Sequence, residues 1–315
     1  MPLLESDYDP RGIFRHAHAS TIIPSLLRRV LAPSYVRERL ALADGDFVDL
    51  DRLRTGARRL AVLCHGLEGD SSRPYMRGMA RALSTAGWDV VCYNFRGCSG
   101  EPNRSSRTYH SGATDDLREV LAHVMPEYGL TVLVGFSLGG NLVLKYLGEE
   151  GAAAAVAGAM AISVPVDLDD ACARICRPSN RLYHDRFMRK LKKKIRTKAA
   201  AYPGTVDPAP LAGVRHLRAF DDAYTAPLHG FRDAADYYAR CSSLPGLGDI
   251  RVPALLLTAA NDPLLGDRCY PREIARKSSH LHLEVADHGG HTGWYLRGGT
   301  YYSERRAVEF LEDLA

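Results

Sequence analysis

Residues 131–147 read TVLVGFSLGGNLVLKYL, and this stretch is the strongest indication of the fold in the sequence. Thr131 to Gly135 is a short apolar run typical of a buried strand. A second set of apolar residues recurs at helical spacing, namely Leu142, Val143, Tyr146 and Leu147. A G-x-S-x-G motif at residues 135–139 joins the two segments. This order predicts a strand, a sharp turn and a helix.

The sharp turn explains the glycines of the motif. A serine in a strained strand-to-helix turn needs neighbours without a Cβ atom, because the chain must fold back tightly. Ser137 would then expose its Oγ above the sheet, at a helix N-terminus where backbone amides favour negative charge. Such a turn is typical of a nucleophilic serine, although an ordinary glycine-rich turn also fits the bare motif.

A nucleophilic serine needs a base, and the base needs a carboxylate that orients it. Candidates for both follow Ser137 along the chain, each shortly after an apolar run. Asp262 follows residues 254–259, and His291 follows residues 281–285. Because the carboxyl ends of parallel strands lie at one edge of a sheet, these side chains are expected to meet. The sequence therefore predicts Ser137, Asp262 and His291 as catalytic residues.

Three nearby residues compete for the roles of acid and base. Asp267 and Asp287 are alternative acids, but Asp267 lies further from its strand and Asp287 precedes the histidine too closely. His288 is the alternative base. We expect Asp262 and His291 because they occupy the ends of successive predicted strands in the order serine, acid, histidine.

The tetrahedral intermediate of acyl transfer carries a negative oxygen, which two backbone amides commonly bind. The amide of Leu138, directly after Ser137, is one expected donor. The amide of Leu67 is the other, in the segment His65 to Gly69 that follows the apolar run Leu60 to Cys64. Taken alone, that segment would equally fit a turn that ends a strand.

Short apolar runs alternate with helical patterns along most of the chain, which is typical of an α/β fold with a mostly parallel sheet. Residues 36–51 predict an N-terminal antiparallel hairpin that turns at Asp44-Gly45. Helices are expected from Thr114, as the cap, and after Ser303, with an apolar stripe that reaches Leu314. Buried strands are expected at Leu60 to Cys64, Asp89 to Phe95, Thr131 to Gly135, Val156 to Ser163, Ala254 to Ala259 and Leu281 to Val285.

Residues 164–252 interrupt this alternation, because helical patterns follow one another there without a convincing strand. Insertions at the carboxyl ends of parallel strands commonly face the substrate in α/β folds. We therefore expect one domain, residues 1–315, in which residues 164–252 form a helical cap.

The most basic segment, Arg186 to Lys198, lies in this predicted cap. Met188, Leu191 and Ile195 recur within it at helical spacing, so it predicts a cationic amphipathic helix. Such a helix could contact an anionic membrane surface weakly or attract acidic groups. We expect instead that its apolar stripe packs on the core and that its basic face is solvated.

Composition excludes several classes of protein. The chain has 315 residues, of which 46% are hydrophobic and 25% charged, and this excludes disordered, collagen-like and coiled-coil proteins. Forty-one Lys and Arg against 37 Asp and Glu are too small an excess to predict a nucleic-acid partner. Seven scattered cysteines, an odd number, favour reduced thiols over a disulfide framework, and the lack of a C-x-x-C pair argues against a zinc knuckle. With no visible signal peptide or membrane-spanning run, we expect a cytoplasmic protein with no metal and no cofactor.

Several segments together carry a family resemblance. They are HGLEG at 65–69, NFRGCSGEPN at 94–103, YHSG at 109–112, GFSLGGN at 135–141, AYPG at 201–204, FDD at 220–222, HGF at 229–231 and HGGH at 288–291. From about Arg11 to its C-terminus the chain resembles the YheT-like branch of the α/β-hydrolases, which includes esterases, lipases and acyltransferases. The resemblance implies a charge relay of Ser137, Asp262 and His291.

Two positions depart from the pattern of this branch. Asn261 stands where the family often has the first of two aspartates, which leaves Asp262 as the better acid. Ser20 stands where a glutamine is usual before Thr21.

We expect a serine carboxylesterase that acts on a small-molecule ester with a short- to medium-chain acyl group or on a lipid ester. An alcohol acyltransferase would use the same acyl-enzyme and pass the acyl group to an alcohol instead of water. A catalytically idle protein that binds an apolar ligand is a further alternative, against which the complete set of serine, acid and histidine argues.

Overall fold

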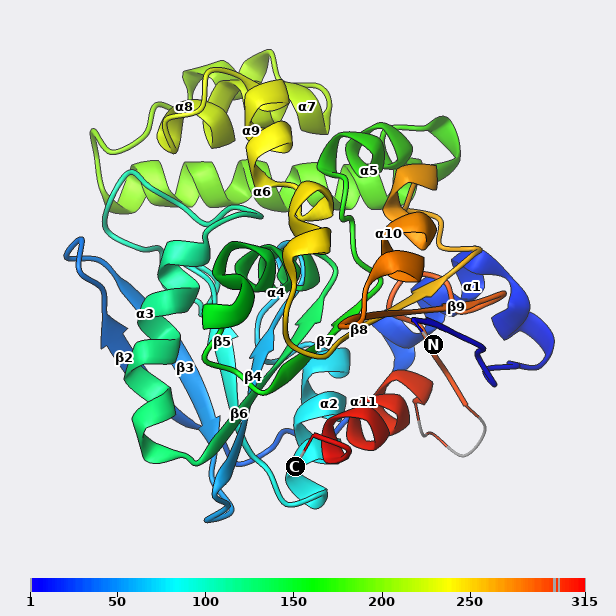
Figure 1. Ribbon diagram of the computed structural model, residues 1–315. Helices are drawn as coiled ribbons and strands as arrows, with labels where there is room; N and C mark the ends of the chain where they lie inside the picture. Colours follow the sequence, from blue (N-terminus) through cyan, green and yellow to red (C-terminus); the bar gives the residue numbers. More distant parts are fainter. Residues whose placement is uncertain (1, 297–298, 300, 315) are drawn as a thin grey trace.

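The computed structural model describes residues 2–296, 299 and 301–314. Within them a nine-stranded sheet runs in the order β1-β9-β8-β7-β6-β4-β5-β3-β2 (Figure 1). The strands are β1 (Leu3–Leu4), β2 (Val36–Ala41), β3 (Phe47–Leu53), β4 (Arg59–Cys64), β5 (Asp89–Asn94), β6 (Leu130–Phe136), β7 (Gly158–Ile162), β8 (Ala254–Ala259) and β9 (Leu281–Ala286). Strand β3 is antiparallel to β2 and β5, and the other neighbouring pairs are parallel. The predicted α/β class and N-terminal hairpin are confirmed.

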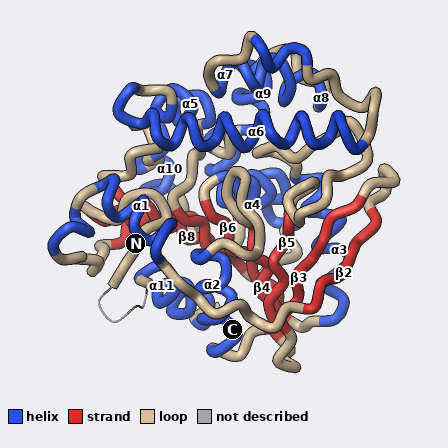
Figure 2. Tube along the Cα trace, turned by 180° about the vertical axis from the view of Figure 1, so that it is seen from behind, coloured by secondary structure: helices blue, strands red, loops and turns tan. Residues whose placement is uncertain are grey.

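Helices cover both faces of the sheet (Figures 1 and 2). Those outside residues 164–252 are α1 (Ala17–Leu27), α2 (Pro74–Thr85), α3 (Thr114–Val124), α4 (Leu138–Glu150), α10 (Arg272–Lys277) and α11 (Tyr302–Glu312). Helices α3 and α4 share one hydrophobic cluster with one face of the sheet. Helices α2 and α11 share a second cluster with the opposite face.

Strand β4 shows why the central strands are apolar throughout. Leu60 and Val62 belong to the cluster on one face of the sheet, whereas Ala61 and Leu63 belong to the cluster on the other face. Side chains alternate between the faces along a strand, so a sheet covered on both sides needs apolar residues at every position. Each of these four side chains is buried.

The segment between β7 and β8 is helical, as predicted. It holds α5 (Leu168–Ile175), α6 (Arg181–Ala201), α7 (Leu217–Phe220), α8 (Ala226–Leu228) and α9 (Ala234–Cys241). These helices lie across the carboxyl ends of the central strands, at the top of Figure 1. They have a hydrophobic cluster of their own. We propose that residues 164–252 form a cap within one domain, as the sequence predicts.

Helix α6 contains the predicted basic segment, and its apolar stripe of Met188, Leu191 and Ile195 is buried. The expected solvation of its basic face is only partly right. Lys198 is buried and donates to Asn103 Oδ1 at 2.9 Å, and Lys194 Nζ lies 3.0 Å from the Glu68 carboxylate. Four of the lysines bind protein acceptors, namely Lys190, Lys192, Lys194 and Lys198.

Two predicted helix boundaries are corrected. Thr114 is the first helical residue of α3 and not its cap, which is Ala113; the Thr114 hydroxyl instead donates to Glu149 at 2.6 Å. Helix α11 ends at Glu312, so Leu314 lies beyond the helix.

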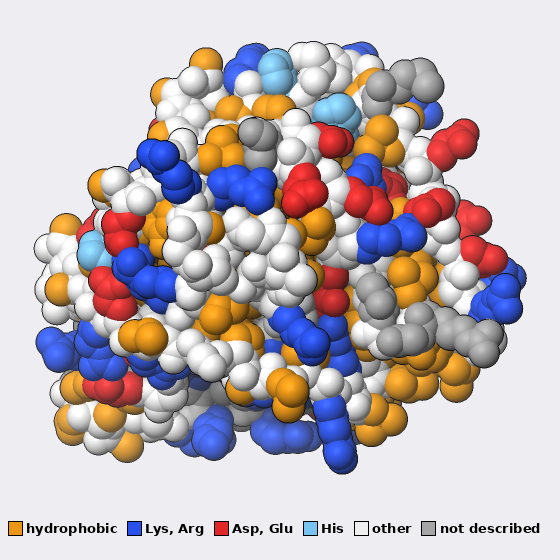
Figure 3. Space-filling view, turned by 90° about the horizontal axis from the view of Figure 1, so that it is seen from below, with side chains coloured by type: hydrophobic (Ala, Val, Ile, Leu, Met, Phe, Trp, Pro, Cys, Tyr) orange, Lys and Arg blue, Asp and Glu red, His pale blue; other side chains and the backbone are white. Residues whose placement is uncertain are grey.

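No helix of the described residues is long and apolar enough to cross a bilayer. The face of the molecule in Figure 3 carries positive, negative and apolar side chains intermixed. This mixture agrees with the small net charge of the chain.

A buried ion pair ties the loop after β5 to helix α3. Arg96 and Asp116 are each about 1% exposed, and two guanidinium nitrogens of Arg96 donate to the two oxygens of Asp116 at 2.7 Å. The third nitrogen lies 2.8 Å from Asp44, at the hairpin turn. Arg96 thus fixes three segments that are distant in sequence.

Arg96→Met should lower the free energy of unfolding by about 3–5 kcal/mol, because the buried Asp116 carboxylate loses both hydrogen bonds from the guanidinium. Urea unfolding measures this loss. The matched control is Arg232→Met, which removes an exposed pair with Asp233 and should leave the free energy of unfolding nearly unchanged. Equal losses in the two variants would contradict the assignment.

Candidate active site

The residue at the tip of the turn between β6 and α4 is Ser137. Its backbone φ is +52°, a left-handed conformation that costs free energy for a residue with a side chain. Close packing enforces the turn: a Cβ atom on Gly139 would overlap the backbone oxygen of Cys64, and one on Gly135 would overlap that of Gly139. The predicted reason for the motif glycines is therefore seen directly.

The structure brings together the three residues predicted from the ends of three strands. His291 Nε2 lies 3.0 Å from Ser137 Oγ, and His291 Nδ1 lies 2.8 Å from Asp262 Oδ2. The Asp262 side chain is fully buried and that of His291 is 12% exposed. With Nδ1 protonated and donating to the carboxylate, Nε2 is free to accept the serine proton.

The competing residues lie apart from this chain of hydrogen bonds. Asp267 and Asp287 are exposed, and neither carboxylate forms a hydrogen bond with His291. His288 forms no hydrogen bond with Ser137. The geometry therefore favours Asp262 and His291 over these alternatives.

Helix α1 supports the loop that carries Gly290 and His291, here called the histidine loop, and the local sequence patterns do not predict this role. The backbone amide of His291 donates to Thr21 Oγ1 at 2.9 Å. Asn261 Oδ1 accepts from the amide of Gly290 at 3.0 Å, and Asn261 Nδ2 donates to the carbonyl of Arg15 at 3.0 Å. An aspartate at position 261 could not make the second bond, because an ionised carboxylate only accepts. The departure from the family pattern at this position thus fits the N-terminal segment of this chain.

The other departure, Ser20, is buried. Its hydroxyl donates to the carbonyl of His16 at 2.9 Å, so it bonds within its own helix. A Cβ atom on Gly293 would overlap the backbone oxygen of Ser20, which places this part of α1 directly against the loop that carries His291.

In the segment His65 to Gly69, the amides on either side of Leu67 are bound to tyrosine hydroxyls. The amide of Gly66 donates to the Tyr75 hydroxyl at 3.0 Å, and that of Glu68 donates to the Tyr109 hydroxyl at 2.9 Å. Among the described residues, no hydrogen bond engages the amides of Leu67 and Leu138. Both leucines line a cavity that contains Ser137. These are the two amides predicted from the sequence as oxyanion donors.

Buried His65 holds this segment in place. Its Nδ1 donates to the carbonyl of Gly66 at 2.8 Å, and its Nε2 accepts from the amide of Phe95 at 3.1 Å. Burial lowers the pKa of His65 to about 4, and only the neutral ring can accept at Nε2. No local periodicity in the sequence predicts this role, because Phe95 lies 30 residues away, directly after β5.

Two cavities meet at Ser137. The first, of about 120 Å³, lies beneath the proposed cap and is mostly apolar. The second, of about 350 Å³, lies between α1, the His65 to Gly69 segment and the start of α6. Residues that line both cavities are Leu67, Ser137, Phe187, Leu264 and His291. An ester carbonyl at Ser137 could therefore extend its two substituents into separate spaces.

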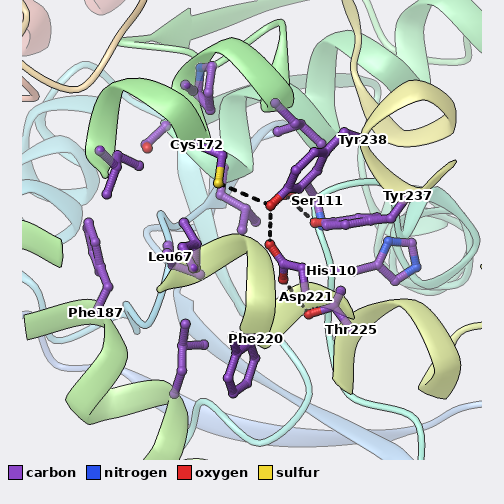
Figure 4. A pocket seen from close by; sticks show the side chains of 18 of the residues that line it. Leu67, His110, Ser111, Cys172, Phe187, Phe220, Asp221, Thr225, Tyr237 and Tyr238 are labelled. Atoms are coloured by element: carbon purple, nitrogen blue, oxygen red, sulfur yellow. Dashed lines mark hydrogen bonds between the residues drawn. The ribbon is translucent and has the colours of Figure 1, made fainter. Parts of the chain in front are cut away.

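A group of polar side chains interrupts the apolar wall of the first cavity (Figure 4). Asp221 accepts hydrogen bonds of 2.6 Å from the hydroxyls of Tyr238 and Thr225. Burial raises the pKa of Asp221 to about 6. Asp222 accepts from the backbone amide of Ala234, and His229 Nδ1 bonds to the carbonyl of Thr225, so both side chains are engaged by the backbone.

Residues 61–296 match the family described as alpha/beta hydrolase fold. The chain is 38% identical over 304 residues to YheT of Escherichia coli, provisionally named an esterase, covering 94% of this chain and 88% of that one. It is 26% identical to the human phospholipase ABHD3, covering 99% and 80% of the two chains. Among solved structures, the Pyrococcus furiosus esterase Pf2001 superposes with a TM-score of 0.57 at 17% identity, covering 89% and 92%.

The buried carboxyl of Asp221 makes stability depend on pH. Because its folded-state pKa is raised above the ordinary value, ionisation disfavours the folded protein, and stability falls as the pH rises through about 6. Asp221→Asn cannot ionise. Relative to the parent protein, its free energy of unfolding should therefore rise by about 1 kcal/mol between pH 5 and pH 8. Urea unfolding at both pH values measures the change, and identical pH dependence in the parent protein and Asp221→Asn would refute the role of Asp221.

Proposed function

Because the chain belongs to the α/β-hydrolase family and is an ester hydrolase of the esterase and lipase type, we propose that Ser137 is the nucleophile that forms its acyl-enzyme. The observation that carries the proposal is the unbroken path of hydrogen bonds from Ser137 Oγ through His291 to Asp262. A serine hydroxyl is a weak nucleophile without such a base.

In the proposed reaction, Ser137 Oγ attacks the ester carbonyl carbon while His291 Nε2 takes the hydroxyl proton. Asp262 keeps the imidazole oriented and stabilises its positive charge. As the tetrahedral intermediate collapses, the bond to the alcohol oxygen breaks, and the alcohol leaves with the proton from His291. Water then attacks the acyl-serine with His291 again as the base, releasing the acid and restoring the enzyme.

The amides of Leu67 and Leu138 are the proposed oxyanion donors. Their support is that both line the cavity at Ser137 and that the amides on either side of Leu67 are bound to tyrosine hydroxyls. Each such donor typically lowers the barrier by about 3 kcal/mol. Because His65 and the tyrosines fix the segment in advance, little reorganisation would accompany the reaction.

The first cavity is the proposed site for the acyl chain. Its lining is dominated by aliphatic and aromatic side chains, which supports an apolar occupant. Its small volume supports short- to medium-chain acyl groups. Transfer of the acyl group to an alcohol would use the same intermediate, with the alcohol taking the place of water. The expected cytoplasmic location stays a prediction.

A fluorophosphonate probe should label the parent protein at a single site, because an activated serine displaces the fluoride from phosphorus. Ser137→Ala should remove both labelling and ester hydrolysis, and His291→Ala should reduce both by several orders of magnitude. Peptide mass spectrometry locates the label. Labelling that persists in Ser137→Ala would exclude the proposed nucleophile, whereas no labelling of the folded parent protein would favour an idle binding protein.

Replacing each candidate acid, Asp262 or Asp267, by asparagine tests which of them orients His291. Asp262→Asn should lower kcat by about 10⁴-fold, because the wrong imidazole tautomer is then favoured. Asp267→Asn should retain the parent kcat, because the exposed Asp267 carboxylate lies outside the hydrogen-bonded path. Steady-state kinetics and circular dichroism measure activity and folding together. A larger loss in Asp267→Asn would reverse the assignment.

A further inference from the structure

The second cavity differs from the first in charge. Four cationic side chains line it, those of Arg28, Arg73, Arg186 and Lys190. The acid in its lining is Glu68. This imbalance lies within the space that opens directly at Ser137.

The Glu68 carboxylate forms its direct contacts with groups other than these cations. Its carboxylate lies 3.0 Å from Lys194 and accepts a 2.8 Å hydrogen bond from the Tyr109 hydroxyl, and its side chain is only 8% exposed. The backbone oxygen of Glu68, in contrast, accepts hydrogen bonds from Lys190 at 3.0 Å and from Arg73 at 3.1 Å. A carbonyl orients a cation without cancelling its charge.

Two of the four cations already have carboxylate partners. Arg28 pairs with Glu304 and stacks on the ring of Tyr301, and Arg73 lies 3.3 Å from Asp70. Arg186 and Lys190 have none among the described residues, since no carboxylate there lies within ion-pair distance of either. These two residues are therefore the available charges of the cavity.

Arg186 and Lys190 lie four residues apart on α6, so their side chains share one face of the helix. Like charges at this spacing repel. Burial lowers the pKa of Lys190, and the charges of Arg73 and Arg186 lower it further, whereas the charges of Glu68 and Asp70 act in the opposite direction. A bound anion would relieve this repulsion.

The position of the cavity indicates which part of an ester it would receive. In the proposed reaction the leaving alcohol takes its proton from His291, so it must lie on the side of Ser137 where the histidine loop lines the space. Thr292, which follows His291, and Thr21, which holds that loop, line the second cavity but not the first. The apolar first cavity remains for the acyl chain.

We propose that the second cavity binds the alcohol part of the ester and that Arg186 and Lys190, assisted by Arg73, bind an anionic group on that alcohol. Phosphate fits best, because its three terminal oxygens can accept from several cations at once. The inference rests on the proposed function, since it places the ester bond at Ser137. It makes esters of phosphorylated or otherwise anionic alcohols the preferred substrate class.

The test compares two dissolved substrates with the same acyl chain, hexanoylglycerol 3-phosphate and hexanoylglycerol, both well below the concentration at which they aggregate. The parent protein should show the higher kcat/KM for the phosphate ester. Arg186→Gln and Lys190→Gln should each lower the ratio of the two kcat/KM values by at least about fivefold, because each removes one cation from the phosphate. Because Arg186 is exposed, its loss should not affect folding.

Arg189→Gln is the matched control. It removes the same charge from an exposed position of the same helix, but Arg189 lines neither cavity. Its substrate ratio should equal that of the parent protein. Glycerol 3-phosphate, the expected alcohol product, should also inhibit competitively and far better than glycerol.

Three results would overturn the inference: no preference of the parent protein for the phosphate ester, an unchanged ratio in both Arg186→Gln and Lys190→Gln, or an equal loss in Arg189→Gln. A preference that arises only on vesicles with anionic lipid, and equally for the neutral ester, would show attraction to a surface instead and would also overturn it. In all these cases Ser137-dependent hydrolysis of hexanoylglycerol persists. If the parent protein does not hydrolyse hexanoylglycerol at all, that result would instead refute the proposed function.

Discussion

The left-handed backbone of Ser137 is the constraint on which the site depends. Its conformation is unfavourable for a serine and persists because the chain on both sides is packed too closely for any other path. Gly139 lies against the end of β4, and that same strand end leads into the segment with Leu67. One packing contact therefore aligns the serine, the start of α4 and the second candidate oxyanion donor.

The histidine side of the site is held from a different part of the chain. Thr21 in α1 binds the amide of His291, and Asn261 joins the loop before His291 to the N-terminal segment. The N-terminal segment is joined to this loop by hydrogen bonds and by close packing. Small rearrangements of that segment would therefore shift the imidazole of His291 relative to Ser137. The same helix also lines the cavity proposed for the alcohol, so α1 contributes to both positioning and recognition.

Local patterns are sufficient to predict the strands from β2 to β9, the hairpin, the serine turn and the order of Ser137, Asp262 and His291. They depend on periodicity, turn residues and the rule that parallel strands end at one edge. Strand β1, the support from Thr21 and the capture of Lys198 by a distant loop were not predictable in this way. Each joins residues that are far apart in sequence, and a lysine on a helix looks the same in sequence whether water or a carbonyl is its partner.

The central claim is that Ser137 carries the acyl group between two half-reactions. The most direct measurement is acid quenching during turnover of a short-chain ester, followed by mass spectrometry of the peptide that contains residue 137. We predict the added mass of the acyl group on Ser137, appearing within the first turnover and absent in His291→Ala. An acyl group on another residue, or turnover without any covalent adduct even when deacylation is slowed, would contradict the account.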